Sequence, residues 1–94
     1  MPHDQMTECE TLRQYKVDGK YDWRWKVVPV SEVVDVPTPK VRCAHCWGAV
    51  KVHKQKAATG PAHHVEHRLR TDSEGCRGGH YFKGEHRMSP NPVS

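Results

Sequence analysis

Two cysteines separated by two residues, Cys43 and Cys46, constrain this 94-residue chain more than any other feature. Thiolates at this spacing fit a zinc knuckle, a tight turn in which both sulfurs face one metal ion. A redox pair of the same spacing needs a strand before it and a helix after it, whereas proline and strand signals surround this pair. The spacing therefore predicts one structural Zn²⁺. Gly48 is expected to supply the permissive dihedral angle of the turn.

A closed tetrahedral zinc site needs two further ligands, and four side chains are candidates for these positions: His64, His67, Cys76 and His80. A helix over residues 64–67 would place both histidines on one face, so that both could join Cys43 and Cys46. An extended segment would point them to opposite faces, so that only one could bind. The preference of zinc for thiolate favours the second arrangement. The predicted ligands are Cys43, Cys46, His67 and Cys76, with His64 as the alternative and His80 left open.

Glu66 lies between two histidines, and a carboxylate in this position can act as a general base in a metalloenzyme. The segment lacks the His-Glu-x-x-His order that places a glutamate beside a metal-bound water. A site closed by four protein ligands also leaves no position for a substrate. We therefore expect a non-enzymatic protein with no small-molecule substrate.

The chain is too polar to fold around a large core. It is 35% hydrophobic and 28% charged, with a mean hydropathy of −0.88, and domains of this size often depend on a metal. The predicted fold class is α+β: a small zinc-stabilised domain, zinc-ribbon-like, with short antiparallel strands and one or two short helices. The predicted parts are a polar, partly disordered N-terminal segment at 1–19, a zinc-binding domain at 20–88 with its metal module at 41–80, and an irregular tail at 89–94.

Local patterns predict several elements. Residues 7–17 are compatible with a short helix, and Asp18-Gly19 is a turn signal. Residues 21–27 alternate large apolar with polar side chains, which indicates a half-buried strand whose two tryptophans fill the core, with a binding surface as the alternative. Short strands are expected at 40–43 and 49–53, and a loop at 71–79. The aromatic and apolar residues of the first strand are Tyr21, Trp23, Trp25 and Val27.

Positive charge and metal-binding residue types share one segment. Residues 40–87 hold ten Lys or Arg against four Asp or Glu, and seven of the eight histidines. This balance favours a polyanionic partner, so DNA or RNA is the first predicted partner and a protein the alternative. Trp47 and Tyr81-Phe82 are candidates for stacking on unpaired bases. The candidate nucleic-acid-binding residues are Lys51, Lys54, Lys56, Arg68, Arg70 and Arg77.

A family resemblance follows from Cys43-x2-Cys46, Val50, the Gly60-Pro61 loop, His64-x2-His67 and Cys76. This pattern resembles the cysteine-histidine segment of competence protein CoiA-like proteins. The resemblance covers residues 41–76, with Val65 in place of an aromatic residue and without the nuclease-like portion of that family. It implies a zinc-ribbon-like module that accompanies DNA-related functions and implies no catalysis. The chain also resembles short uncharacterised bacterial proteins that carry a Trp-Arg-Trp strand before the cysteine pair.

The expected compartment is the cytoplasm. No apolar run is long enough for a transmembrane helix, and the N-terminus lacks the pattern of a signal peptide, so no membrane partner is expected. In a reducing compartment cysteines serve as metal ligands or free thiols more often than in disulfides. Cys9, in the acidic part of the chain, is expected to be a free or buried thiol.

Overall fold

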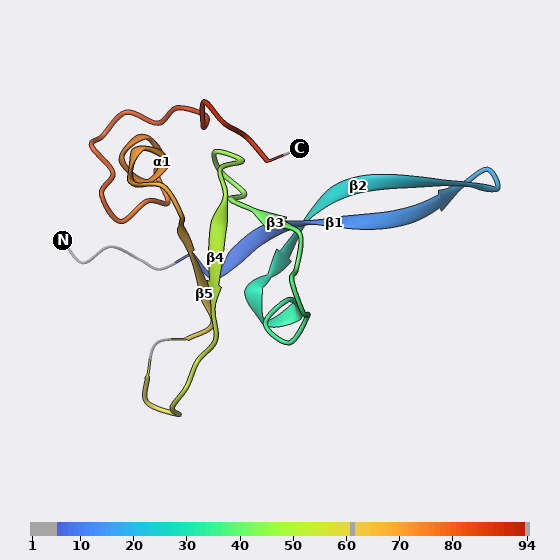
Figure 1. The fold of residues 1–94 in the computed structure, drawn as a ribbon, viewed down its shortest axis with the longest axis horizontal. Helices are drawn as coiled ribbons and strands as arrows, with labels where there is room; N and C mark the ends of the chain where they lie inside the picture. The colour runs from blue at the N-terminus through green and yellow to red at the C-terminus, as the bar shows by residue number, and fades with distance from the viewer. Residues whose placement is uncertain (1–5, 61, 94) are drawn as a thin grey trace.

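Two small antiparallel sheets make up most of the regular secondary structure. The computed structural model describes residues 6–60 and 62–93 (Figure 1). The first sheet has the strand order β2-β1-β3 and the second has the order β4-β5. The elements are β1 (Glu8–Val17), β2 (Lys20–Pro29), the 3-10 helix η1 (Val30–Glu32), β3 (Val41–Arg42), β4 (Val50–His53), β5 (His64–His67) and α1 (Arg70–Gly75). The expected antiparallel strands are confirmed, with one short α-helix in the described residues and sheet as the main component.

β1 and β2 form a long hairpin that projects from the rest of the molecule (Figure 1). The two strands pair over their full length, and Asp18 and Gly19 close the turn with φ angles of 50° and 80°. Positive φ at both positions is typical of the type I′ turn that suits hairpin twist. β1 pairs with β3 at Glu10 and Thr11. Beyond this contact, from Leu12 on β1 to Trp25 on β2, the hairpin has only two strands, and we call this part the arm.

The predicted helix over residues 7–17 is wrong, because β1 occupies residues 8–17. The few apolar residues of this segment are too sparse to form a helical face, and pairing with β2 satisfies the backbone instead. Residues on both sides of Gly19 therefore belong to one sheet. Figure 1 shows β1 entering the arm directly from the body of the protein.

The core is small and contains valine and cysteine rather than aromatic side chains. Its buried apolar residues are Met6, Cys9, Val28, Val30, Val33, Cys43, Cys46, Val50, Val65 and Cys76. Tyr21 and Trp23 are instead 67% and 59% exposed. The strand over residues 21–27 was correctly predicted, but the expectation that its two tryptophans fill the core is wrong, because Trp23 is exposed and Trp25 is only partly buried. β2 extends past the core, so its outer apolar residues face solvent.

The two sheets meet near the N-terminal end of β1. The backbone N–H of Val65 donates to the carbonyl oxygen of Met6 at 2.9 Å, which attaches the chain before β1 to β5. α1 follows β5 and occupies the first part of the region predicted as a loop, so that prediction is wrong for residues 71–75. The described part of the C-terminal tail lacks regular structure. None of the helices in the described ranges has the length and hydrophobicity needed to cross a bilayer.

Candidate metal centre

Three cysteines and one histidine from distant parts of the chain converge at the centre of the protein. Cys43 and Cys46 follow β3, His67 ends β5, and Cys76 follows α1. Their candidate ligand atoms lie within 4.8 Å of one another, and all three cysteines are fully buried. The structure therefore brings together the four residues that the sequence favoured as ligands.

The spacing of these atoms fits a tetrahedral metal ion. The Sγ atoms of Cys43 and Cys76 are 3.7 Å apart, and Cys46 Sγ lies 3.4 Å from His67 Nε2. With Zn–S near 2.3 Å and Zn–N near 2.1 Å, tetrahedral geometry separates two sulfurs by about 3.8 Å, and sulfur from nitrogen by about 3.6 Å. The donor set and its spacing are compatible with a structural zinc site.

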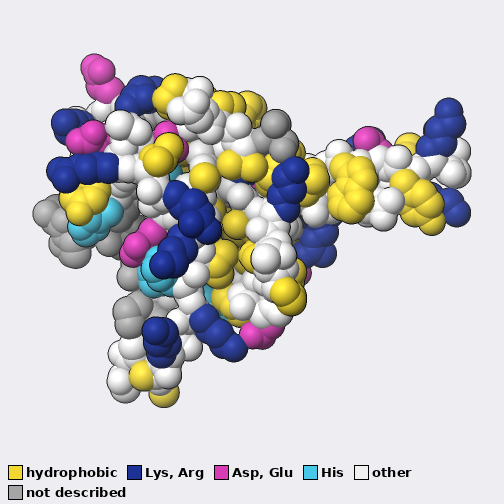
Figure 2. Space-filling view, viewed as in Figure 1, with side chains coloured by type: hydrophobic (Ala, Val, Ile, Leu, Met, Phe, Trp, Pro, Cys, Tyr) yellow, Lys and Arg dark blue, Asp and Glu magenta, His cyan; other side chains and the backbone are white. Residues whose placement is uncertain are grey.

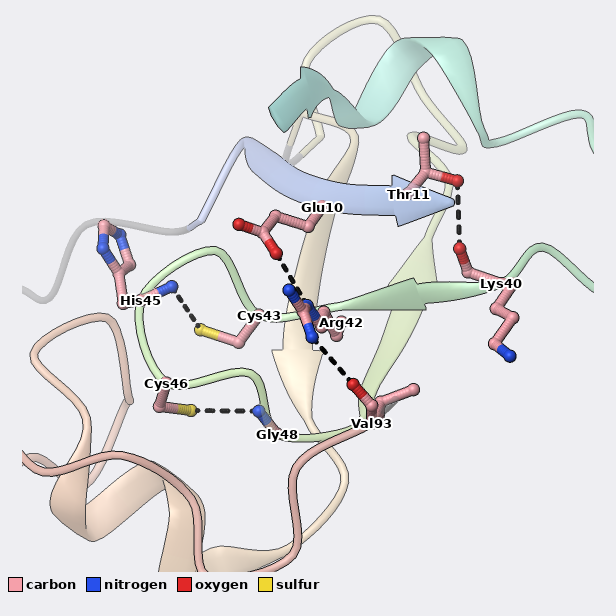
Figure 3. Close-up of polar contacts among 9 residues, drawn as sticks. All are labelled: Glu10, Thr11, Lys40, Arg42, Cys43, His45, Cys46, Gly48 and Val93. Carbon is pink, nitrogen blue, oxygen red and sulfur yellow. Dashed lines mark hydrogen bonds and ion pairs between the residues drawn. The ribbon is translucent and has the colours of Figure 1, made fainter. Parts of the chain in front are cut away.

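The turn that carries the first two cysteines has the hydrogen bonds of a zinc knuckle (Figure 3). The backbone N–H of His45 donates to Cys43 Sγ at 3.3 Å, and that of Gly48 donates to Cys46 Sγ at 3.4 Å. The Cys43 N–H donates to the Gly48 carbonyl at 2.9 Å, which closes the turn. These N–H groups stabilise negative charge on the sulfurs.

The predicted role of Gly48 in this turn is wrong. The positive φ angle, 66°, belongs to Trp47. Gly48 is required for a different reason, because a Cβ at this position would lie 2.6 Å from Asp72 Oδ2 and 3.3 Å from Cys46 Sγ. The glycine therefore permits close packing of α1 against the knuckle.

A second turn presents Cys76. The Gly78 N–H donates to Cys76 Sγ at 3.4 Å, and the Gly79 N–H donates to the Cys76 carbonyl at 2.8 Å. The thioether of Met6 lies 3.8 Å from Cys43 Sγ. Met6 thus packs on the cluster and contributes to its exclusion from water.

The extended conformation of β5 decides between the two candidate histidines. His64 and His67 are three residues apart on one strand, so their side chains lie on opposite faces of the β4–β5 ladder. His67 faces the cysteines, whereas His64 Nδ1 donates to the carbonyl oxygen of Ala62 at 2.7 Å. His64 therefore lies outside the cysteine cluster. Among the residues that the structure describes, the cluster consists of Cys43, Cys46, His67 and Cys76, and His80 is not part of it.

The four groups alter one another's protonation. Hydrogen bonds from Cys46 and Cys76 hold the pKa of Cys43 far below its usual range, against the opposing effect of burial. The hydrogen bond with Cys43, together with burial, raises the pKa of Cys46 above its usual range. Burial alone would lower the pKa of His67, but hydrogen bonds to Cys43 and Cys76 outweigh it and raise this pKa to about 9. Zinc binding at neutral pH would therefore displace protons from the cluster.

Next to the knuckle, the side chain of Arg42 stacks on two tryptophan rings, Trp25 and Trp47. This stack was not predicted from the sequence. The guanidinium carbon of Arg42 lies 4.1 Å from the ring centre of Trp25 and 4.6 Å from that of Trp47. Its Nε–H donates to Glu10 Oε1 at 2.6 Å, and another N–H donates to the Val93 carbonyl at 2.9 Å (Figure 3). Arg42 thus joins the arm, the knuckle and the C-terminal tail. The long range of these contacts left no local pattern in the sequence.

The six predicted nucleic-acid-binding residues are spread over several elements. Lys51 and Lys56 are exposed on β4 and in the following loop. The remaining four make contacts within the protein. Lys54 pairs with Asp35, Arg68 donates to the Val50 carbonyl, Arg70 pairs with Glu74 and lies over Tyr81, and Arg77 donates to His45.

Comparison with known proteins places the chain in a family without assigning an activity. No curated protein and no solved structure matches it. The resemblance to CoiA-like proteins stays a prediction. A family model matches the whole chain, residues 1–94. The protein with this cysteine-histidine cluster therefore belongs to that family, which is uncharacterised.

Proposed function

We propose that this protein holds one structural Zn²⁺ through Cys43, Cys46, His67 and Cys76 and binds single-stranded nucleic acid on its projecting arm. The observation that carries the metal proposal is the convergence of three buried thiols and one imidazole at tetrahedral spacing. The zinc would be structural, because four protein ligands leave no open position for chemistry.

The composition of the core supports a stabilising role for the metal. The largest fully buried side chains are valines, including Val28, Val30 and Val65. A core of this size supplies little hydrophobic stabilisation, and a metal ion that joins β3, β5 and α1 offsets this weakness.

Removal of the metal tests this proposal. We expect a chelator to change the near-ultraviolet circular dichroism of the zinc-loaded protein, because Trp47 lies in the knuckle and stacks on Arg42. Added Zn²⁺ should restore the spectrum. A spectrum that the chelator leaves unchanged, with zinc shown to be lost, would contradict a structural role.

The proposed nucleic-acid surface is the aromatic face of the arm, defined as Tyr21, Trp23 and Trp25 of β2. Alternate residues of a strand share one side, so these three rings line one face of the hairpin. Lys16 lies 6.0 Å from the ring centre of Tyr21, and Arg42 lies against Trp25. Figure 2 shows hydrophobic side chains exposed along the arm, with Lys and Arg near its tip.

Exposed rings beside cationic side chains support this choice of partner. Unpaired bases stack on such rings whatever their sequence, and stacking contributes about 1–3 kcal/mol per base. The cationic groups attract phosphates, and the chain carries a net charge of +4. A base-paired duplex hides the faces of its bases, so single strands are the expected ligand.

Fluorescence anisotropy with a labelled oligothymidylate tests the proposal. Trp23→Ala should weaken binding by roughly tenfold or more, in line with the loss of one stacked base. Tyr15→Ala is the matched control, because Tyr15 lies on the opposite face of the same hairpin. Binding should also weaken as the salt concentration rises. Equal effects of the two substitutions would contradict a site on the aromatic face.

A protein-binding adaptor is the second candidate function. The observation that favours it is the exposure of Val27 on β2 and Val17 on β1, 48% and 42%. Exposed apolar groups of this kind are typical of protein interfaces. Failure of the protein to bind single-stranded DNA or RNA at any salt concentration would favour the adaptor over the nucleic-acid proposal.

A further inference from the structure

We propose a second metal site, separate from the cysteine cluster, formed by His53, His64 and Glu66. This site lies on the β4–β5 ladder and is independent of the nucleic-acid proposal. His53 pairs directly with His64 across the ladder, and Glu66 follows His64 by two residues on the same face. His67 lies on the other face. The two clusters therefore share a ladder but face opposite ways.

The distances among the three side chains fit a shared metal ion. His53 Nε2 lies 3.3 Å from one carboxylate oxygen of Glu66, and His64 Nε2 lies 3.5 Å from the other. Ligand atoms about 2.1 Å from a tetrahedral zinc are separated by about 3.4 Å. One donor atom from each residue can be chosen so that all three lie within 4.8 Å of one another.

Hydrogen bonding orients the buried histidine for this role. Only 7% of His64 is exposed, and its Nδ1–H donates to the carbonyl oxygen of Ala62 at 2.7 Å. This bond keeps the proton on Nδ1 and leaves the lone pair of Nε2 directed to Glu66, as is usual for metal-binding histidines. The ring of His53 stacks on that of His64, with centres 4.9 Å apart and planes at 11°, so the partly exposed His53 ring must turn about its side-chain bonds for both Nε2 lone pairs to meet at one ion.

The donor set indicates the class of metal and the character of the site. Two imidazoles and one carboxylate suit divalent first-row transition metals such as Zn²⁺ and Co²⁺. Three protein ligands leave at least one position for water or another ligand. We infer an exchangeable site, in contrast to the closed cysteine cluster.

A metal titration of the full chain tests this site. The protein is first loaded with one equivalent of Zn²⁺, and Co²⁺ is then added as the probe, followed by calorimetry and visible absorption. We expect one equivalent of Co²⁺ to bind with ligand-field bands and without a thiolate charge-transfer band. His53→Ala and Glu66→Gln should each weaken Co²⁺ binding by at least about tenfold. These side chains are 34% and 60% exposed, so both variants should keep their zinc and their fold.

His63→Ala is the matched control, since His63 adjoins His64 in the chain but accepts a hydrogen bond from the Gln55 N–H instead. It should bind Co²⁺ like the wild type. The proposal is overturned if the zinc-loaded protein takes up no Co²⁺, or if His53→Ala and His63→Ala bind it equally. A thiolate charge-transfer band would place the Co²⁺ at the cysteine cluster and would likewise overturn a separate site.

Discussion

The buried carboxylate of Asp72 lies against the backbone of Gly48, so that α1 packs directly on the zinc knuckle. Asp72 is 2% exposed, and its Oδ1 accepts a hydrogen bond of 2.7 Å from the Ser89 hydroxyl. The Ser89 N–H in turn donates to the Cys46 carbonyl at 2.8 Å. The contacts that join α1, the knuckle and the C-terminal tail are thus possible only because Gly48 has no side chain.

Substitution of Gly48 should therefore destabilise the protein. A Cβ in Gly48→Ala would lie 2.6 Å from Asp72 Oδ2. Overpacking of this kind lowers the free energy of unfolding by about 1–3 kcal/mol. Gly60→Ala is the control, because its Cβ would meet its nearest neighbour at 3.4 Å. Urea unfolding of the two zinc-loaded variants compares them, and equal stability would contradict the packing argument.

Cys76→Ser and His64→Ala should differ in their retention of tightly bound zinc. Cys76 belongs to the cysteine cluster, whereas His64 lies on the other face of β5. Loss of a direct ligand should weaken zinc binding by more than the roughly 10- to 100-fold typical of outer-shell changes. Chelator competition measures the affinity. Retention of tight zinc by Cys76→Ser, together with its loss in His64→Ala, would reverse the ligand assignment.

Loss of Arg42 should be far more destabilising than loss of an exposed arginine. The side chains of Arg42 and Glu10 are 11% and 15% exposed, so Arg42→Ala would leave a largely buried carboxylate without its cation. The expected loss of unfolding free energy is about 3 kcal/mol. Arg24→Ala breaks an exposed pair with Asp22 and should cost less than about 1 kcal/mol. Thermal unfolding distinguishes the two, and similar melting temperatures would contradict this prediction.

Cys9 should react slowly with alkylating reagents while the protein is folded. Burial raises the pKa of its thiol from 9.0 to about 11, which reduces the thiolate at pH 8 by about 100-fold. Because the pKa is higher in the folded state, the associated stabilisation is present below pH 9 and is lost as the pH rises towards 11. Mass spectrometry after iodoacetamide treatment measures the rate, with Cys9→Ala identifying the site. Rapid labelling of folded protein at pH 8 would contradict this environment.

The failure of the core prediction for β2 has a simple physical cause. Alternation of apolar and polar residues correctly indicated a strand and the face that its aromatic residues share. The same alternation cannot show whether another element covers that face. Here Trp25 lies near the body and stacks on Arg42, whereas Trp23 lies farther along the arm and is exposed.

The cysteine spacing by itself determined that Cys43 and Cys46 form one knuckle, because a short turn suffices to bring them together. Only the tertiary structure decided that residues 64–67 form a strand, which allows one histidine to bind, and that the face of this strand turned to the thiols carries His67 rather than His64. The grouping of His53 with His64 likewise depends on the register of β4 and β5. Strand pairing is a long-range interaction, and the local sequence does not encode which residues it places opposite each other.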